Sequence, residues 1–140
     1  MIGLQMIRRA AHMLSALALA VPLCAQAQAF AKGADVSWVS QQEAAGYAFY
    51  GDDALRHDPF ALLKAKGTNA IRLRVWVNPA NGWNDGRDTL YKAKRAAAQG
   101  QRIMIDFHYS DTWADPAHQA KPAAWVGHTV AQLRTDVSPI

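Results

Sequence analysis

Polar and aromatic side chains gather in a segment that overlaps the end of a short apolar run. The run spans residues 102–107, and residues 106–115 hold three carboxylates, a histidine, a tyrosine and a tryptophan. Strand interiors favour apolar residues, so this much polarity at a strand end indicates a site rather than a core. Carboxylates accept hydrogen bonds from sugar hydroxyls, and aromatic rings stack on the C–H faces of a sugar. The segment therefore predicts a carbohydrate-binding site.

Repeats of strand, loop and helix must position this segment. Alternation of apolar residues predicts strands over residues 34–39, 69–77 and 102–108. Their starts lie 35 and 33 residues apart, which is the length of one strand–helix unit. Such units build parallel strands with right-handed crossovers, either in a doubly wound sheet or in a TIM barrel.

Two helices are expected between these strands. The first begins after Asp58, an N-capping residue followed by proline, and ends at Gly67. The second is opened by Asp88 or Thr89, runs over residues 90–99 and ends at Gly100.

The polar residues of the strands choose between the two architectures. In a TIM barrel, alternate residues of each strand face the interior, and the site lies at the C-terminal ends of the strands. In the second and in the third strand, one set of alternate positions holds the residues that are expected to face inward. They are Arg72, Arg74, Trp76, Asp106 and His108. A doubly wound nucleotide-binding sheet would have a glycine-rich turn after its first strand, where residues 40–43 read Ser-Gln-Gln-Glu. The sequence therefore predicts an α/β fold, the N-terminal three βα units of an incomplete TIM (β/α)8 barrel.

The N-terminus has the order of regions found in a signal peptide. Arg8 and Arg9 precede an apolar run over residues 13–23, which is too short to span a bilayer. Residues 27–29, Ala-Gln-Ala, fit the small-x-small cleavage rule, and Ala25 to Ala27 offer a second site. We expect residues 1–29 to be a signal peptide and residues 30–140 a partial TIM-barrel domain, secreted or periplasmic. The arginine pair leaves twin-arginine and general export both open.

Charge and cysteine content exclude several classes of partner. Residues 30–140 carry 13 basic and 11 acidic side chains, a net charge of +2, and the single cysteine, Cys24, lies in the predicted signal peptide. Lys92, Lys94 and Arg95 form a basic cluster on the second helix, which is expected to be a solvated helix face rather than a nucleic-acid patch. We expect no nucleic-acid partner, no cofactor and no membrane contact after cleavage.

Three long segments carry a resemblance to a known family. They are Lys-Gly-Ala-Asp-Val-Ser-Trp at residues 32–38, Ile-Arg-Leu-Arg-Val-Trp-Val-Asn-Pro at residues 71–79, and residues 106–125. These segments resemble glycoside hydrolase family 53, the arabinogalactan endo-β-1,4-galactanases. The resemblance implies an eight-stranded barrel, β-1,4-galactan as the polysaccharide substrate, and a monomeric enzyme. It also implies a retaining mechanism with two glutamates, one at the end of strand four and one at the end of strand seven.

The two family glutamates have no counterpart in this sequence. The one glutamate of the chain, Glu43, follows the first strand, so both catalytic glutamates are expected after Ile140. A retaining glycosidase needs two carboxyl groups about 5–5.5 Å apart. A complete TIM barrel has roughly 250 residues, and residues 30–140 number 111. We therefore expect the 140-residue chain to be inactive by itself and to hold no catalytic residue.

The resemblance suggests supporting or substrate-binding roles for several residues. Arg72 and Arg74 resemble arginines that orient the nucleophile carboxylate, with a structural ion pair as the alternative. His108 resembles a residue that donates to a sugar hydroxyl or to the acid/base carboxyl. The acids are expected to hold an arginine or a histidine, and the tryptophans near strand ends to stack under a galactosyl unit. The full predicted set is Asp35, Arg72, Arg74, Trp76, Asp106, His108, Asp111 and Trp113.

Two other functions stay open at this point. Asp106, His108 and Asp111 offer N and O ligands at close spacing, as in a metal-dependent TIM-barrel hydrolase, although we expect no metal site. A non-catalytic galactan-binding remnant would keep the aromatic platforms without the catalytic carboxylates. Loss of activity with a chelator would favour the first alternative, and galactan binding by residues 30–140 the second.

Overall fold

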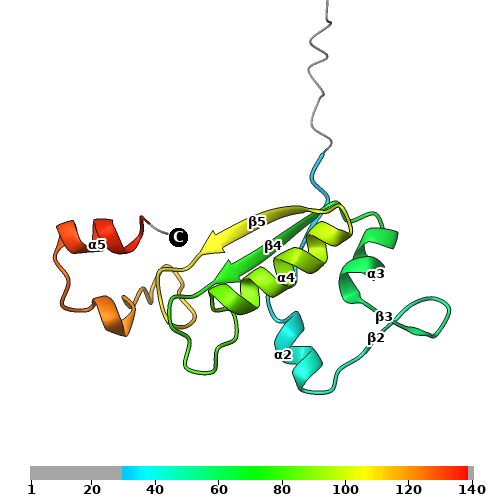
Figure 1. The fold of residues 1–140 in the computed structure, drawn as a ribbon, viewed down its shortest axis with the longest axis horizontal. Coiled ribbons are helices and arrows are strands. Elements are labelled where there is room, and N and C mark those ends of the chain that lie inside the picture. The colour runs from blue at the N-terminus through cyan, green and yellow to red at the C-terminus, as the bar shows by residue number, and fades with distance from the viewer. Residues whose placement is uncertain (1–29, 139–140) are drawn as a thin grey trace, which may run out of the picture. The chain divides into compact units, whose positions relative to one another are not determined.

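The computed structural model describes residues 30–138, and Figure 1 shows its elements. The predicted signal peptide lies outside the described residues. Three parallel strands form the main sheet in the order β1 (Gly33–Asp35), β4 (Ala70–Val75) and β5 (Arg102–Phe107). The predicted parallel arrangement of the three strands is therefore confirmed.

Helices and a small hairpin connect the strands. The hairpin pairs β2 (Phe49–Tyr50) with β3 (Arg56–His57) in antiparallel fashion. The longest helix within residues 30–138, α4, packs along β4 and β5 (Figure 1). The helical elements are α2 (Val39–Ala44), α3 (Pro59–Ala65), α4 (Gly86–Ala98), the 3-10 turn η1 (Ala123–Trp125) and α5 (Val130–Asp136).

Helix α3 forms where its capping residues predict it. The Asp58 carboxylate accepts hydrogen bonds from the backbone N–H groups of Phe60 and Ala61, which have no partner inside the helix. Pro59 occupies the first turn, and Gly67 follows the helix with φ +90°, a conformation that favours glycine. The expected first helix is confirmed.

Helix α4 begins earlier than its expected start at Asp88 or Thr89. The N-cap is Asp85, whose carboxylate accepts from the Asp88 N–H at 2.7 Å. The Asp88 carboxylate instead accepts from the Asn84 N–H at 2.7 Å, so its own side chain closes the preceding turn. The expected start was wrong because two capping aspartates stand three residues apart and the first of them begins the helix.

The first strand is shorter than the expected residues 34–39. The Asp35 carboxylate accepts from both the N–H and the hydroxyl of Ser37, at 3.0 and 2.6 Å, and this local pairing draws the backbone out of the strand. The chain then enters α2 at Val39, so residues 40–43 are helical where a loop was expected.

The apolar parity of β4 faces the helices and forms the core. Ile71 and Leu73 are fully buried against residues of α2, α3 and α4. Burial of such a side chain contributes about 1.5–3 kcal/mol, so these two residues anchor the sheet to its helices. The complete buried cluster is Val39, Phe60, Ile71, Leu73 and Ala96.

The basic cluster of the second helix is not a solvated face. Lys92 is fully buried. Arg95 forms ion pairs with Glu43 at 2.7 Å and with Asp58 at 2.8 Å. Of the three residues, Lys94 is the exposed one. The prediction was wrong for two of its three members because sequence shows the charge of a side chain but not the acceptors that the fold brings to it. Within residues 30–138, no helix has the length and apolar character needed to cross a bilayer.

Candidate functional site

The strands present one face that is opposite to the helices and rich in charge. The register sets Asp35 beside Arg72 and sets Arg74 beside Asp106, so all four side chains share a side of the sheet. This polar face comprises Asp35, Ser37, Arg72, Arg74, Asp106 and His108. The face extends to the C-terminal ends of the strands, which is the end at which βα barrels place their sites.

Arg72 joins the carboxylates of the two outer strands. Its guanidinium forms ion pairs with Asp35 of β1 and with Asp106 of β5. The arginine side chain is 40% exposed, so solvent screens both pairs. Arg72 therefore ties the three strands together across the face.

Asp106 also binds His108, the residue that follows β5 by one position. The imidazole Nε2 lies 2.8 Å from the Asp106 carboxylate. The other ring nitrogen, Nδ1, is buried and has no hydrogen-bond partner among residues 30–138. A neutral imidazole that donates from Nε2 has its acceptor lone pair on Nδ1, so this nitrogen is the one left for a further partner.

Asp35 is held by a residue that sequence reasoning missed, Ser37. Burial by itself raises the pKa of Asp35, but hydrogen bonds from the Ser37 hydroxyl and N–H, together with Arg72, bring the pKa below its ordinary value. Ser37 is 1% exposed, and its hydroxyl also accepts from the Arg74 N–H at 2.9 Å. The Asp-x-Ser spacing, which is typical of Asx turns, is the sequence signal that points to Ser37.

Arg74 has surroundings of another kind. Its side chain is 2% exposed, and its guanidinium carbon lies 4.7, 4.8 and 4.3 Å from the ring centroids of Trp38, Trp76 and Trp113. Guanidinium Nε and Nη2 have no hydrogen-bond partner within the described part of the chain. Burial lowers the pKa of Arg74, yet an arginine stays charged in proteins. The indole faces stabilise this cation by cation–π attraction.

The three indole rings differ in what they leave open. Trp76 is 8% exposed, whereas Trp38 and Trp113 are 41% and 55% exposed. The Trp38 and Trp113 rings lie 6.4 Å apart with an interplanar angle of 31°. The structure therefore places two partly exposed indoles beside Arg74, while Trp76 serves mainly as a buried support.

Asp111 is not brought to the polar face. One of its carboxylate oxygens accepts from the Asn78 N–H at 2.9 Å and the other from the Ala123 N–H at 2.8 Å. Asp111 thus clamps the loop after β4 to the start of η1. In the part of the chain that the structure describes, no group of three or more His, Cys, Asp or Glu side chains could hold a metal ion, so Asp106, His108 and Asp111 do not form a ligand set.

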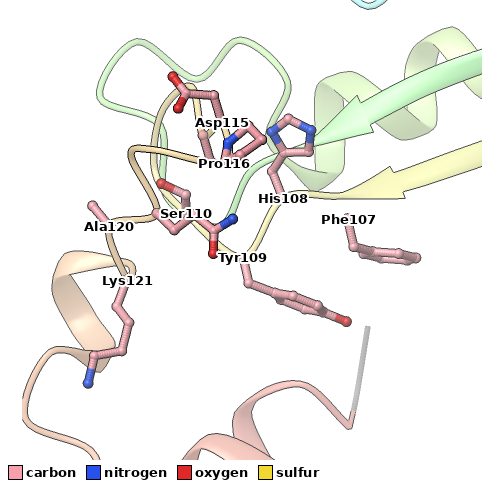
Figure 2. Close-up of a pocket in the computed structure, with 10 residues that line it drawn as sticks. Phe107, His108, Tyr109, Ser110, Asp115, Pro116, Ala120 and Lys121 are labelled. Carbon is pink, nitrogen blue, oxygen red and sulfur yellow. The ribbon is translucent and has the colours of Figure 1, made fainter.

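A groove of about 460 Å³ lies between the end of β5 and the loop that follows it. Figure 2 shows Phe107, His108 and Tyr109 leaving the end of β5. Lys121 and Asp115 contribute charged groups to the lining. The groove is therefore lined in part by the 106–115 segment that the sequence predicts to bind carbohydrate.

The match to a known family covers almost all of the described residues. The family model described as glycosyl hydrolase family 53 matches residues 31–139. The chain belongs to this family. Individual relatives support the assignment: the endo-beta-1,4-galactanase of Bacillus subtilis (strain 168) is 46% identical over 104 residues, which are 69% of this chain and 24% of the relative.

Solved structures of family 53 show the same fold. The family 53 catalytic domain of Ignisphaera aggregans superposes with a TM-score of 0.71 at 35% identity, over 76% of this chain and 32% of that one. A fungal beta-1,4-galactanase superposes with a TM-score of 0.65 at 47% identity, over 66% and 28% of the two chains. The chain thus spans about a quarter to a third of the length of these family 53 proteins. The predicted fold class, the first three βα units of a TIM barrel, is confirmed.

Proposed function

We propose that the protein to which this chain belongs is an exported, monomeric, endo-acting glycoside hydrolase that cleaves β-1,4-galactan with retention of configuration. Membership of family 53 and the similarity to an endo-beta-1,4-galactanase support the reaction class and the substrate. The order of regions in residues 1–29 supports export.

The observation that carries the proposal is the unpaired guanidinium of Arg74. It is buried at the end of β4, surrounded by three indole rings, and has two nitrogens without a partner in residues 30–138. A buried cation of this kind is suited to a carboxylate, which it would orient through parallel hydrogen bonds and keep ionised. An ionised carboxylate is the nucleophile of a retaining glycosidase.

The carboxylate for Arg74 does not come from the glutamate of this chain. Glu43 binds Arg95 through both of its oxygens, at 2.7 and 2.8 Å, and lies with the helices rather than on the polar face. The two glutamates that the family resemblance implies are expected after Ile140. In the complete protein, the polar face would therefore orient those glutamate carboxylates and bind the sugar.

The sugar would lie on the exposed indoles beside the polar face. Trp38 and Trp113 are partly exposed, and a ring face turned away from Arg74 would suit the C–H face of a galactosyl unit. His108 offers its unpaired Nδ1 at the same end of the strands. In the complete protein, these groups would hold the sugar beside the catalytic carboxylates.

The test is an assay of the complete protein on β-1,4-galactan. We expect the viscosity of the polysaccharide to fall well before reducing ends accumulate, because endo cleavage shortens long chains first. Proton NMR of the first product should show the β-anomer, as retention requires. Unchanged galactan, or an initial α-anomer, would contradict the proposal. The 140-residue chain should release no reducing ends from galactan.

A further inference from the structure

We propose that Lys92 is a positioning residue for the candidate active site, which it sets in place from the opposite side of the sheet. Through Ser37 and Asn84, its ammonium group fixes both the backbone and the aromatic surroundings of Arg74. This inference rests on the proposed function for its consequence in catalysis, but its structural part can be tested independently.

The ammonium group of Lys92 is fully buried and fully bonded. Nζ donates to the Ser37 carbonyl at 2.6 Å, to the Asn84 side-chain oxygen at 2.7 Å and to the Asp88 carboxylate at 2.8 Å. These three bonds use all three donors of a lysine. Burial lowers the pKa of Lys92, and the bond to Asp88 acts in the opposite direction. Burial of a charge costs free energy unless it is paired and hydrogen-bonded, and here these bonds fix the ammonium group in one position.

The first connection from Lys92 to Arg74 passes through Ser37. Lys92 fixes the carbonyl of Ser37, and the hydroxyl of the same residue accepts the Arg74 N–H at 2.9 Å. That hydroxyl also donates to Asp35 at 2.6 Å, so Ser37 joins two members of the polar face. A shift of Ser37 would therefore move the backbone of Arg74 and the carboxylate of Asp35 together.

The second connection passes through Asn84. Lys92 donates to the side-chain oxygen of Asn84. The backbone carbonyl of Asn84 accepts from the backbone N–H of Trp76 at 2.8 Å. The Trp76 ring lies 4.8 Å from the guanidinium carbon of Arg74. Asn84 is fully buried with φ +63°, a conformation that non-glycine residues rarely adopt and that needs support from its surroundings. Lys92 supplies part of that support.

A third contact from the same helix reaches Arg74 directly. The Thr89 hydroxyl, three residues before Lys92, donates to the Arg74 carbonyl at 3.2 Å. The backbone of Arg74 is thus held at its N–H through Ser37 and at its carbonyl by Thr89. Helix α4 therefore sets the position of an arginine that faces away from it.

Arg95 provides the matched comparison on the same helix. Its guanidinium is also partly buried and bonded to two carboxylates, those of Glu43 and Asp58. Those partners belong to α2 and to the cap of α3, and neither bonds to Arg74, Ser37 or Asn84 among the described residues. Loss of Arg95 removes a partly buried, paired charge from the same helix without touching the polar face.

The experiment compares Lys92→Met with Arg95→Met in the complete enzyme. For Lys92→Met we expect kcat on β-1,4-galactan to fall about 100-fold with KM changed less than about threefold, because misplacement of Arg74 affects the transition state more than binding. For Arg95→Met we expect a comparable fall in Tm with kcat changed less than about twofold. Equal losses of kcat in the two variants would overturn the proposal.

A milder variant covers the case in which Lys92→Met fails to fold. Asn84→Gly removes one acceptor of Lys92, and glycine adopts a positive φ without strain. We expect this variant to fold and to lose about tenfold in kcat. An unchanged kcat in Asn84→Gly would overturn the second connection.

Near-UV circular dichroism separates this inference from the proposed function. We expect Lys92→Met to lose most of the near-UV signal of the packed indoles with an unchanged far-UV spectrum, and Arg95→Met to keep both. Absence of galactan cleavage in the wild-type enzyme would contradict the proposed function, while this spectrum would still test the positioning. A wild-type near-UV spectrum in folded Lys92→Met would overturn it.

Discussion

The two arginines of β4 lie two residues apart on one face of the sheet, yet their surroundings are opposite. Arg72 is 40% exposed and is neutralised by Asp35 and Asp106. Arg74 is 2% exposed and lies among three indoles, with no carboxylate bound to it in residues 30–138.

This difference separates a framework from an open site. The Arg72 end of the face has its charges paired within the chain, so its main effect is to join three strands. At the Arg74 end, a buried charge without a bound carboxylate costs free energy, which attraction to Asp35 and Asp106 offsets in part, and proteins retain such features chiefly where function requires them. The Arg74 end is therefore where the reacting groups are expected to meet.

The largest effect is expected when each of the two arginines is replaced by methionine in a separate variant of the complete enzyme. Arg74→Met should lower kcat on galactan about 100-fold or more, because the carboxylate that it would orient loses its charged donor. Arg72→Met should cost less turnover and more stability, since Asp35 and Asp106 lose the cation that joins them. Steady-state kinetics with urea denaturation measures both quantities. Equal losses of turnover in the two variants would remove the distinction between framework and open site.

Trp113 tests whether the open end binds sugar. Trp113→Ala should weaken galactan binding about tenfold, because one stacking interaction is lost, and should also lower Tm, because the ring packs on the Arg74 guanidinium at 4.3 Å. Trp125→Ala is the control, since that ring lies against Tyr109 at 6.2 Å rather than against Arg74. Isothermal titration with galacto-oligosaccharides measures the affinities. A Trp125→Ala variant that binds as weakly as Trp113→Ala would place the sugar elsewhere.

Asp111 tests the framework away from the polar face. Asp111→Ala removes two hydrogen bonds from backbone N–H groups and should lower the free energy of unfolding by about 1 kcal/mol. Urea denaturation followed by fluorescence gives this value. Asp111→Asn keeps one acceptor oxygen and should lose less. An unchanged unfolding free energy in Asp111→Ala would mean that the clamp does not stabilise the loops.

The smallest effect is a dependence of stability on pH at the framework end. The pKa of Asp35 in the folded chain lies below its ordinary value of 3.8, so the unfolded chain takes up this proton first as the pH falls. The stabilisation is complete above pH 3.8 and is lost as the pH falls from there through the folded pKa. Asp35→Asn should therefore show a shallower loss of Tm below this pH than the wild type. Identical slopes would assign the acid sensitivity to other aspartates, such as Asp88, whose pKa is also lowered.

Much of this arrangement is predictable from local patterns in the sequence. The alternation along β4 correctly separates Ile71 and Leu73, which face the helices, from Arg72 and Arg74, which face away. Asp58 correctly marks the start of α3, because capping depends on residues within one turn. The fold class follows from the spacing of the strands, since each βα unit has a characteristic length.

What the sequence hides are the contacts between distant residues. Lys92 reads as an exposed helix residue because two of its three acceptors lie outside α4, at Asn84 and at Ser37, which is 55 residues away. Asp111 reads as a site residue because it lies among the polar residues after β5, yet two backbone N–H groups occupy it. Composition near a strand end thus indicates a site, while the role of each residue depends on partners that only the fold supplies.

The separations along the chain also have a consequence for folding. The bonds that join elements across the polar face link residues 37, 34 and 37 positions apart, namely Arg72 with Asp35, Arg72 with Asp106, and Arg74 with Ser37. Each closes a long loop, so the face has high contact order and cannot assemble within one βα unit. A peptide excised from a single unit, or a motif grafted onto another scaffold, would carry these residues without their arrangement. The chemistry of this surface is a property of the assembled sheet.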